Sequence, residues 1–394
     1  MQQHVAWKFY WFGLKLYDFL GRGKGFAASR MLSAPDSNER LPTLSGHGKS
    51  GGVLYQDGQF DDSRLLIDMA LTAASHGACL VNYVRADSLC KDESGNVNGV
   101  ELTCEESGST WTAKATVVIN ATGPWADDIR KMDDSGCQQM VTHSQGVHIV
   151  LPRKFFPGDT ALIVPKTSDG RVLFLIPWHD HVVIGTTDTP IPAAIDEPTP
   201  QKQEIEFLLK TTDEYLNQTP TQADVLSVFT GIRPLVRDPK SKNTSKLSRD
   251  HEIIVSDSKL VTITGGKWTT VRKMGEEVID RASQLAGKTG GSVTKSTAIH
   301  DGTSVSIDGA AAKLHSDLPY TDQDVVRSVR FEMARSLEDV LARRTRALFL
   351  NSTATIEIAP EVARLMAGEL GESEAWQTDQ VEKFLITANN FTLR

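Results

Sequence analysis

Hydrophobic positions in the first third of the chain change from a helical period to a strand period. Apolar side chains three and four residues apart predict a helix that begins at Asp61 or Asp62 and ends at Gly77. Residues 78–84 then predict a strand. The continuous apolar run 116–120 predicts a strand buried on both faces, as in a parallel sheet.

The pattern changes over residues 141–235. Short apolar segments separated by Pro, Gly and Asp predict a mostly antiparallel sheet, interrupted by a helix near 201–217. Residues 252–282 return to a strand, a glycine turn and a helix that begins at Thr269 or Thr270. A segment rich in Ser, Thr, Gly and Ala, residues 284–318, predicts a linker between domains.

Helical spacing dominates after Tyr320. Thr321 caps a long predicted helix whose apolar positions continue to Leu341, and Pro360 opens another. We interpret the basic run 343–346 as cations at a helix C-terminus, where the helix dipole favours positive charge, and prefer this to an anion site. The patterns together predict a mixed α/β protein with a C-terminal helical domain.

Composition narrows the classes of partner. The net charge of −8 argues against nucleic acid, because phosphate backbones need a basic surface. Four cysteines without a C-x-x-C pair fit reduced thiols and argue against a zinc site. No apolar run is long enough to span a membrane. The aromatic stretch 5–21 predicts either a buried helix or an interfacial patch where aromatic rings meet lipid headgroups.

Two glycine turns follow the predicted buried strands. Ala121-Thr122-Gly123 and Gly265-Gly266-Lys267 would let a ligand approach the backbone closely. The helix after Thr269 would point its free N–H groups at the same place. Either turn alone could also serve geometry only.

Three cations lie in segments that end at the same expected crevice: Arg233, Arg249 and Lys267. Arginine pairs with phosphate or carboxylate through two hydrogen bonds, and lysine adds a point charge, so the set predicts a site for a small dianion. The alternative is a set of unrelated surface ion pairs.

A histidine and two threonines complete the candidate chemistry. His148 lies in an otherwise apolar strand, where it is either a structural residue or a general base for an alcohol. Thr186 and Thr187, with Asp188, form either part of a polar site or a simple β-turn.

A series of segments carries a family resemblance: YQDGQFDDSRL, INATGPWADDIRKMD, GVHIVLP, SDGRVLFLIPW, IGTTDTP, FTGIRPLVRDPKS, SRDHEI, TGGKWTTVRKMGE and EMARSLEDVLARRTRALFLN. In this order, and over nearly the whole chain, they resemble the FAD-dependent glycerol-3-phosphate dehydrogenases. The resemblance implies a Rossmann-like FAD-binding domain of the glycine and D-amino-acid oxidase type, an antiparallel substrate (cap) domain and an all-helical C-terminal domain.

The resemblance also implies domain boundaries. The expected divisions are 1–60 for the N-terminal helix and the start of the cap domain, 61–134 for part of the FAD domain, 135–245 for the cap domain, 246–285 for the returning FAD segment, 286–318 for the linker and 319–394 for the helical domain.

The resemblance assigns roles to the candidate residues. It implies His148 and Arg233 as catalytic residues, and a substrate-binding set made of Arg233, Arg249, Lys267, Thr186 and Thr187. It implies flavin contacts from Val84, Ala121, Thr122, Gly123, Gly265, Gly266, Lys267, Trp268 and Thr269.

The implied reaction is FAD-dependent oxidation of sn-glycerol 3-phosphate to dihydroxyacetone phosphate, with electrons passed to a quinone. The resemblance implies a peripheral protein on the cytoplasmic face of the bacterial inner membrane, or alternatively on the mitochondrial inner membrane. It also allows a homodimer. Two other functions stay open: an amine or amino-acid oxidase of the same fold, and a non-catalytic remnant that binds an anion or a partner.

No predicted strand of this sequence leads into a helix through the family's phosphate-binding G-x-G-x-x-G turn. In the family it opens the FAD domain within a βαβ unit of at least about 30 residues. We therefore expect a truncated form that does not hold FAD or turn over by itself.

Overall fold

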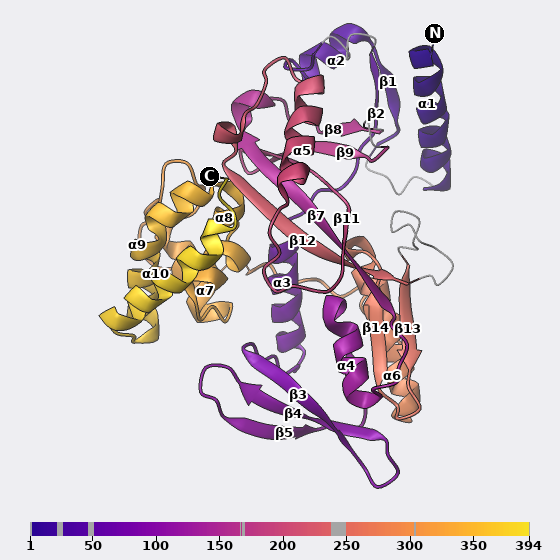
Figure 1. The fold of residues 1–394 in the computed structure, drawn as a ribbon, viewed down its shortest axis with the longest axis vertical. Helices are drawn as coiled ribbons and strands as arrows, with labels where there is room; N and C mark the ends of the chain where they lie inside the picture. The colour runs from indigo at the N-terminus through magenta and orange to yellow at the C-terminus, as the bar shows by residue number, and fades with distance from the viewer. Residues whose placement is uncertain are drawn as a thin grey trace.

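The computed structural model describes residues 2–21, 27–45, 51–165, 167, 170–237, 250–302 and 305–393. Its fold is mixed α/β, as predicted, with a long antiparallel sheet at the centre, smaller sheets beside it and a cluster of helices at the C-terminus (Figure 1).

The N-terminal part is a helix followed by a small sheet. Its elements are α1 (Gln2–Leu20), β1 (Arg30–Leu32), α2 (Ala34–Arg40) and β2 (Gly52–Leu54). β1 and β2 pair antiparallel. From Tyr10 onward α1 leaves several large apolar side chains exposed, including Phe12, Tyr17 and Phe19.

The predicted helix after residue 60 is α3 (Asp62–Ser75), and the Asp61 side chain caps it by accepting the backbone N–H of Arg64. The predicted strand over 78–84 is wrong: residues 78–83 are irregular, and β3 (Val84–Lys91) begins where that strand was expected to end. β3 forms an antiparallel sheet with β4 (Val97–Cys104) and β5 (Thr110–Lys114). Tyr83 accounts for the late start, because its positive φ of 53° is incompatible with an extended strand.

A second three-stranded sheet contains β6 (Ile119–Asn120), β13 (His251–Val255) and β14 (Val261–Gly265). β6 runs parallel to β14 and is only two residues long, much shorter than the predicted strand over 116–120. A short 3-10 turn, η2 (Gly123–Trp125), leads from β6 into α4 (Ala126–Asp133). After β14 the turn η6 (Trp268–Thr270) leads into α6 (Val271–Leu285), whose Val278 packs on Val261 and Ile263.

The central sheet is antiparallel and has the order β11-β7-β10-β9-β8, with β12 also paired to β7. Its strands are β7 (Val141–Pro152), β8 (Leu162–Val164), β9 (Leu173–Trp178), β10 (His181–Gly185), β11 (Thr189–Ile191) and β12 (Ser227–Val236), and the short turns η3 (Arg153–Phe155) and η4 (Gln222–Asp224) join them. α5 (Lys202–Tyr215) covers one face and buries Leu208 against Val147, Ile149 and Leu151 of β7.

The helical domain consists of α7 (Asp322–Phe331), the π-helix η8 (Asp339–Arg344), α8 (Ala347–Leu350), α9 (Ser352–Leu370) and α10 (Glu374–Asn389). It has its own hydrophobic core and lies at one end of β12 (Figure 1).

Two helix predictions in this domain are wrong. The helix from Thr321 ends at Phe331 instead of continuing to Leu341, because Met333 has a positive φ of 59° and the Asp339 carboxylate caps a new turn at Arg335 and Ser336. Pro360 lies inside α9 instead of opening a helix. Pro360 has no N–H group, so one backbone carbonyl of the preceding helical turn lacks its usual hydrogen bond. Because Pro360 is exposed, water can bond this carbonyl instead.

Candidate functional site

The pairing of β7 with β12 gathers the main candidates on one face of the central sheet. Directly opposite pairs in this register are Ser144 with Arg233, Gly146 with Gly231, and His148 with Phe229. Side chains on one face of a strand recur every two residues, so the three pairs share a face. α5 covers the opposite face, through Val147 and Ile149.

The Arg233 side chain lies across Gly146. A Cβ atom at position 146 would lie 2.3 Å from Arg233 Nη2, so only glycine leaves room for the guanidinium. Arg233 Nη2 donates to Thr186 Oγ1 at 3.0 Å and Nη1 donates to the Thr187 carbonyl at 3.2 Å. Asp188 Oδ1 is 3.6 Å from Nη1, and about a third of the side chain (32%) stays exposed. The guanidinium is thus oriented, yet it still faces solvent.

His148 lies between a glycine and an aromatic ring. On one side a Cβ at Gly185 would be 2.2 Å from His148 Cδ2, and on the other the Phe229 ring stacks on the imidazole at 4.9 Å and 13°. Desolvation, together with the positive charge of Arg233, lowers the pKa of His148 to about 4 although the residue keeps some accessible surface. The imidazole is therefore neutral at pH 7.

Open space lies over Gly231, the residue of β12 opposite Gly146. Gly231 is exposed, and a Cβ built there would meet no atom within 4 Å. Gly231 is two residues from both Phe229 and Arg233 on β12. The sheet face thus has an uncovered position at Gly231, which we call the glycine floor. On β12 it lies between Phe229, which stacks on the neutral imidazole, and the cation Arg233.

The two threonines separate in the structure. Thr186 Oγ1 accepts the hydrogen bond from Arg233, on the site face. Thr187 is fully buried, and its hydroxyl accepts the Val147 N–H at 2.9 Å and donates to Glu204 of α5 at 2.7 Å. Thr186 is therefore part of the cluster, whereas Thr187 holds the sheet to α5.

The two glycine turns come close to the same strand. Gly265 and Gly266 have φ values of 76° and 79°, which side chains rarely adopt. A Cβ at Gly265 would lie 2.6 Å from a methyl group of Val236, the last residue of β12. β12 thus connects the sheet face to this turn. Lys267, which follows it, is exposed, as is Thr269, and Trp268 packs edge-on against Phe60 at 6.1 Å.

A buried asparagine that the sequence analysis missed organises the first turn. Asn120 Nδ2 donates to the Ala126 carbonyl and to Thr262 Oγ1 of β14, and its Oδ1 accepts from the backbone N–H and hydroxyl of Thr122. Asn120 therefore fixes the Ala121–Gly123 turn against the neighbouring parallel strand. An amide at the end of an apolar run is the signal that could have found it, since a buried polar group needs partners.

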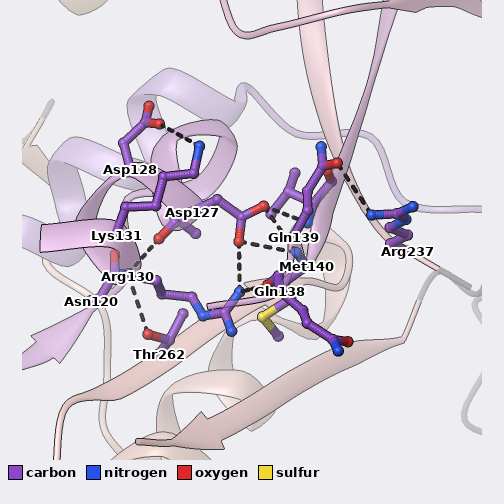
Figure 2. Close-up of polar contacts among 12 residues, drawn as sticks. Asn120, Asp127, Asp128, Arg130, Lys131, Gln138, Gln139, Met140, Arg237 and Thr262 are labelled. Carbon is purple, nitrogen blue, oxygen red and sulfur yellow. Dashed lines mark hydrogen bonds and ion pairs between the residues drawn. The ribbon is translucent and has the colours of Figure 1, made fainter. Parts of the chain in front are cut away.

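Asp127, also missed, ties α4 to the start of β7 (Figure 2). Its carboxylate accepts the backbone N–H groups of Met140 and Val141 and a hydrogen bond from Arg130, which also donates to the Gln138 carbonyl. His143 of β7 bonds the Pro124 carbonyl at 2.7 Å. These bonds join the strand that carries His148 to the turn beside β14.

Two candidates are not brought to this cluster. Val84 begins β3, in the separate three-stranded sheet, and no contact among the described residues joins it to the others. Arg249 lies outside the described residues.

Two family profiles match the chain. Residues 10–281 match FAD dependent oxidoreductase, and residues 258–377 match the C-terminal domain of alpha-glycerophosphate oxidase. The first covers more than half of the chain and includes every candidate residue; the second covers most of the helical domain.

Similar whole proteins agree with these profiles. The chain is 39% identical to a probable mitochondrial glycerol-3-phosphate dehydrogenase of Caenorhabditis elegans, over 95% of this chain and 58% of that protein. It is 35% identical to a mitochondrial glycerol-3-phosphate dehydrogenase of Arabidopsis thaliana, over 95% of this chain and 69% of that protein. The chain thus spans about three fifths of the length of the first of these relatives.

A solved structure has the same fold. It is the glycerol-3-phosphate dehydrogenase of Bacillus halodurans complexed with FAD, which is 26% identical, covers 92% of this chain and 79% of its own, and superposes with a TM-score of 0.77. The chain therefore belongs to the FAD dependent oxidoreductase family, and within it to the FAD-dependent glycerol-3-phosphate dehydrogenases.

Proposed function

We propose that the protein oxidises the secondary alcohol of sn-glycerol 3-phosphate to dihydroxyacetone phosphate. The observation that carries this proposal is the glycine floor of the central sheet, which lies on β12 between Phe229, stacked on His148, and Arg233. One molecule with a hydroxyl group and a phosphate a few atoms apart would meet both His148 and Arg233. The relatives named as glycerol-3-phosphate dehydrogenases support the same substrate.

FAD would supply the hydride acceptor when bound. The described residues fit the flavin side of such a site, because two turns with left-handed glycines, Gly123 and Gly265-Gly266, follow the parallel strands β6 and β14. A Cβ at Gly123 would meet open space. The buried Thr264 hydroxyl, beside Gly265, has no hydrogen-bond partner among the described residues, as expected for a polar group that meets a ligand. Ala121, Thr122, Lys267, Trp268 and Thr269 belong to the same turns and are proposed to contribute; Val84 remains a proposal without a contact that supports it.

His148 is proposed to take the hydroxyl proton. It is neutral at pH 7, so it can accept a proton, but a pKa of about 4 makes it a weak base in the empty site. A phosphate dianion beside Arg233 would offset the positive charge that depresses the pKa, and would make the imidazole a stronger base when the substrate is bound.

Arg233 is proposed to bind the phosphate, with its guanidinium held in place by Thr186. Lys267 is exposed at the neighbouring turn and would add a second positive charge. Arg249 and Thr187 remain proposals from the family resemblance; the former lies outside the described residues, and the hydroxyl of the latter is engaged by Glu204.

The finer partners are also proposals. A quinone as electron acceptor and a homodimer rest on the family resemblance. No described helix is long and apolar enough to cross a bilayer. The exposed aromatic residues of α1 support peripheral contact with a membrane surface. The word mitochondrial in the names of the two relatives supports the mitochondrial location over the bacterial one; the inner membrane itself rests on the family resemblance.

The test is a visible spectrum of the full chain after incubation with excess FAD and desalting, followed by anaerobic addition of glycerol 3-phosphate. Bleaching of retained flavin, with formation of dihydroxyacetone phosphate, is the expected result. Flavin that is bleached by an amine or amino acid, and not by glycerol 3-phosphate, would overturn the proposal. If the eluate is colourless, the substrate is tested by calorimetric binding of glycerol 3-phosphate.

A further inference from the structure

Phe229 contacts a second aromatic ring besides the imidazole of His148. A second phenylalanine, Phe349 of α8, meets Phe229 edge to face with ring centroids 4.9 Å apart and planes at 60°. The imidazole of His148, the ring of Phe229 and the ring of Phe349 thus form a continuous series that passes from the central sheet into the helical domain.

Phe349 itself is held from two further directions. Phe391, near the end of the chain, packs on it edge to face at 5.2 Å. The guanidinium of Arg346 lies over its ring at 4.0 Å. Arg346 is in turn fixed by Asp62, 3.2 Å away, and by a hydrogen bond to Ser63. The ring therefore has little freedom to move away from Phe229.

Hydrogen bonds attach the helical domain to β12 immediately before Phe229. The Ser227 hydroxyl donates to the Leu348 carbonyl at 2.8 Å, and the Val228 N–H donates to the Phe391 carbonyl at 2.9 Å. Ser352 donates its N–H to the Leu226 carbonyl at 2.9 Å. The start of β12 is thus shared between the sheet and the helical domain.

We propose that the helical domain positions His148: Phe349 presses Phe229 onto the imidazole and keeps water from that side, with Phe229 and Phe349 as positioning residues. This inference rests on the proposed role of His148 as the base. It assigns to the C-terminal helices a part in the chemistry of a sheet that they do not belong to.

Among the described residues, Arg233 of β12 is the cation whose charge lowers the pKa of His148, and Asp188, after β10, pairs with it. Arg346 lies behind Phe349, and the neighbours of His148 on its face of β7, Gly146 and Val150, carry no charge. With these charges unchanged, removing the Phe349 ring changes mainly the hydration of the imidazole, and a better hydrated imidazole binds its proton more tightly.

The test is NMR of the full chain labelled with [¹³Cε1]histidine, with the His148 signal assigned from the His148→Gln variant. In the unsubstituted chain this signal should stay constant between pH 8 and pH 5.5. In Phe349→Ala the signal should begin to move before the pH falls to 5.5, because the proton affinity should rise at least about tenfold, which raises the pKa by about one unit. Phe349→Tyr, which keeps the ring, should restore the original behaviour. Phe384→Leu, in the core of the helical domain and away from Phe229, is the matched control and should leave the signal constant.

An unchanged His148 titration in Phe349→Ala, with circular dichroism showing a folded chain, would overturn the inference. A shift as large in Phe384→Leu would also overturn it, since loosening of the whole domain would then be the cause. If Phe349→Ala does not fold, Phe349→Leu, which keeps an apolar side chain without a ring, carries the same test. The measurement needs no turnover: a shifted signal in a protein whose flavin is bleached by an amine or amino acid, and not by glycerol 3-phosphate, would refute the proposed function and leave the positioning intact.

Discussion

Two arginines of this protein stand in opposite situations. Arg233, on the central sheet, bonds neutral oxygen atoms of Thr186 and Thr187, has its carboxylate partner at 3.6 Å and keeps 32% of its side chain exposed. Arg346, at the edge of the helical domain, keeps only 10% and lies between Asp62, Ser63 and the ring of Phe349. The first presents its charge to solvent, and the second uses its charge inside the fold.

The difference lies in the surroundings, not in the side chain. Gly146 leaves room for the Arg233 guanidinium itself, and Gly231, two residues before Arg233 on β12, leaves open space that a ligand can enter. Arg346 lies over the rings of Trp178 and Phe349 and pairs with the carboxylate of Asp62. A cation is thus a binding candidate when the fold fixes its direction and leaves part of its side chain exposed.

The largest expected effect is that of Arg233→Ala on substrate binding. Loss of a charge-assisted pair with phosphate should raise the dissociation constant for glycerol 3-phosphate about 100-fold. Calorimetry on the full chain measures it, and urea unfolding should show a stability within about 0.5 kcal/mol of the original.

Arg233→Lys is the control for charge. It keeps the cation but loses the planar fork, so an intermediate affinity is expected. An affinity unchanged in Arg233→Ala would remove this residue from the phosphate site and would end the contrast with Arg346.

Arg346→Ala should show the converse pattern. The substitution leaves the Asp62 carboxylate without its cation and exposes the Phe349 ring that the guanidinium covers. The free energy of unfolding should therefore fall by about 3 kcal/mol. Glycerol 3-phosphate should bind less than about tenfold more weakly. Urea unfolding, with Arg346→Lys as the control, measures the loss of stability. An Arg346→Ala variant that keeps its stability but loses affinity for glycerol 3-phosphate would contradict the structural role of Arg346.

The sequence could not separate these two arginines. The sequence placed Arg233 in a set of three cations and the basic run 343–346 at the end of a helix. The spacing of residues along the chain, however, indicates neither the burial of an arginine nor its partner. Local signals did better: Asp61 caps α3, and the antiparallel strands before residue 235 follow from their apolar runs. Long-range pairings such as Asn120 with Thr262, or Phe349 with Phe229, have no local trace, because residues distant in the chain provide the two partners.

His148→Gln should change the pH dependence of stability. The pKa of His148 is lowered from 6.5 to about 4 in the fold, so the unfolded chain binds a proton below pH 6.5 that the folded chain refuses until about pH 4. The contribution of the neutral His148 to the free energy of unfolding is therefore fully present above pH 6.5 and is lost as the pH falls towards 4. Between pH 7 and pH 5 this loss is about 2 kcal/mol. Urea unfolding at both pH values should show this loss reduced in the variant; equal losses in the two proteins would be inconsistent with a dry imidazole.

The smallest effects come from the two adjacent threonines. Thr186→Val removes the oxygen that orients Arg233, so glycerol 3-phosphate should bind about tenfold more weakly with stability nearly unchanged. Thr187→Val leaves the Val147 N–H without its partner, so stability should fall by about 1 to 2 kcal/mol with affinity nearly unchanged. Calorimetry and urea unfolding of both variants separate the two roles. Weaker binding in Thr187→Val together with lower stability in Thr186→Val would contradict the roles assigned to the two threonines.

One strand, β12, sets the distances between all of these parts. Its first residues are bonded to the helical domain, its middle carries Phe229 and Arg233, and its last residue, Val236, touches Gly265. Insertion of a single residue before Phe229 would turn Phe229, Gly231 and Arg233 to the α5 side together. For protein engineering, this means that substitutions on β12 keep the spacing of the proposed site, whereas an insertion or a deletion in β12 displaces its residues.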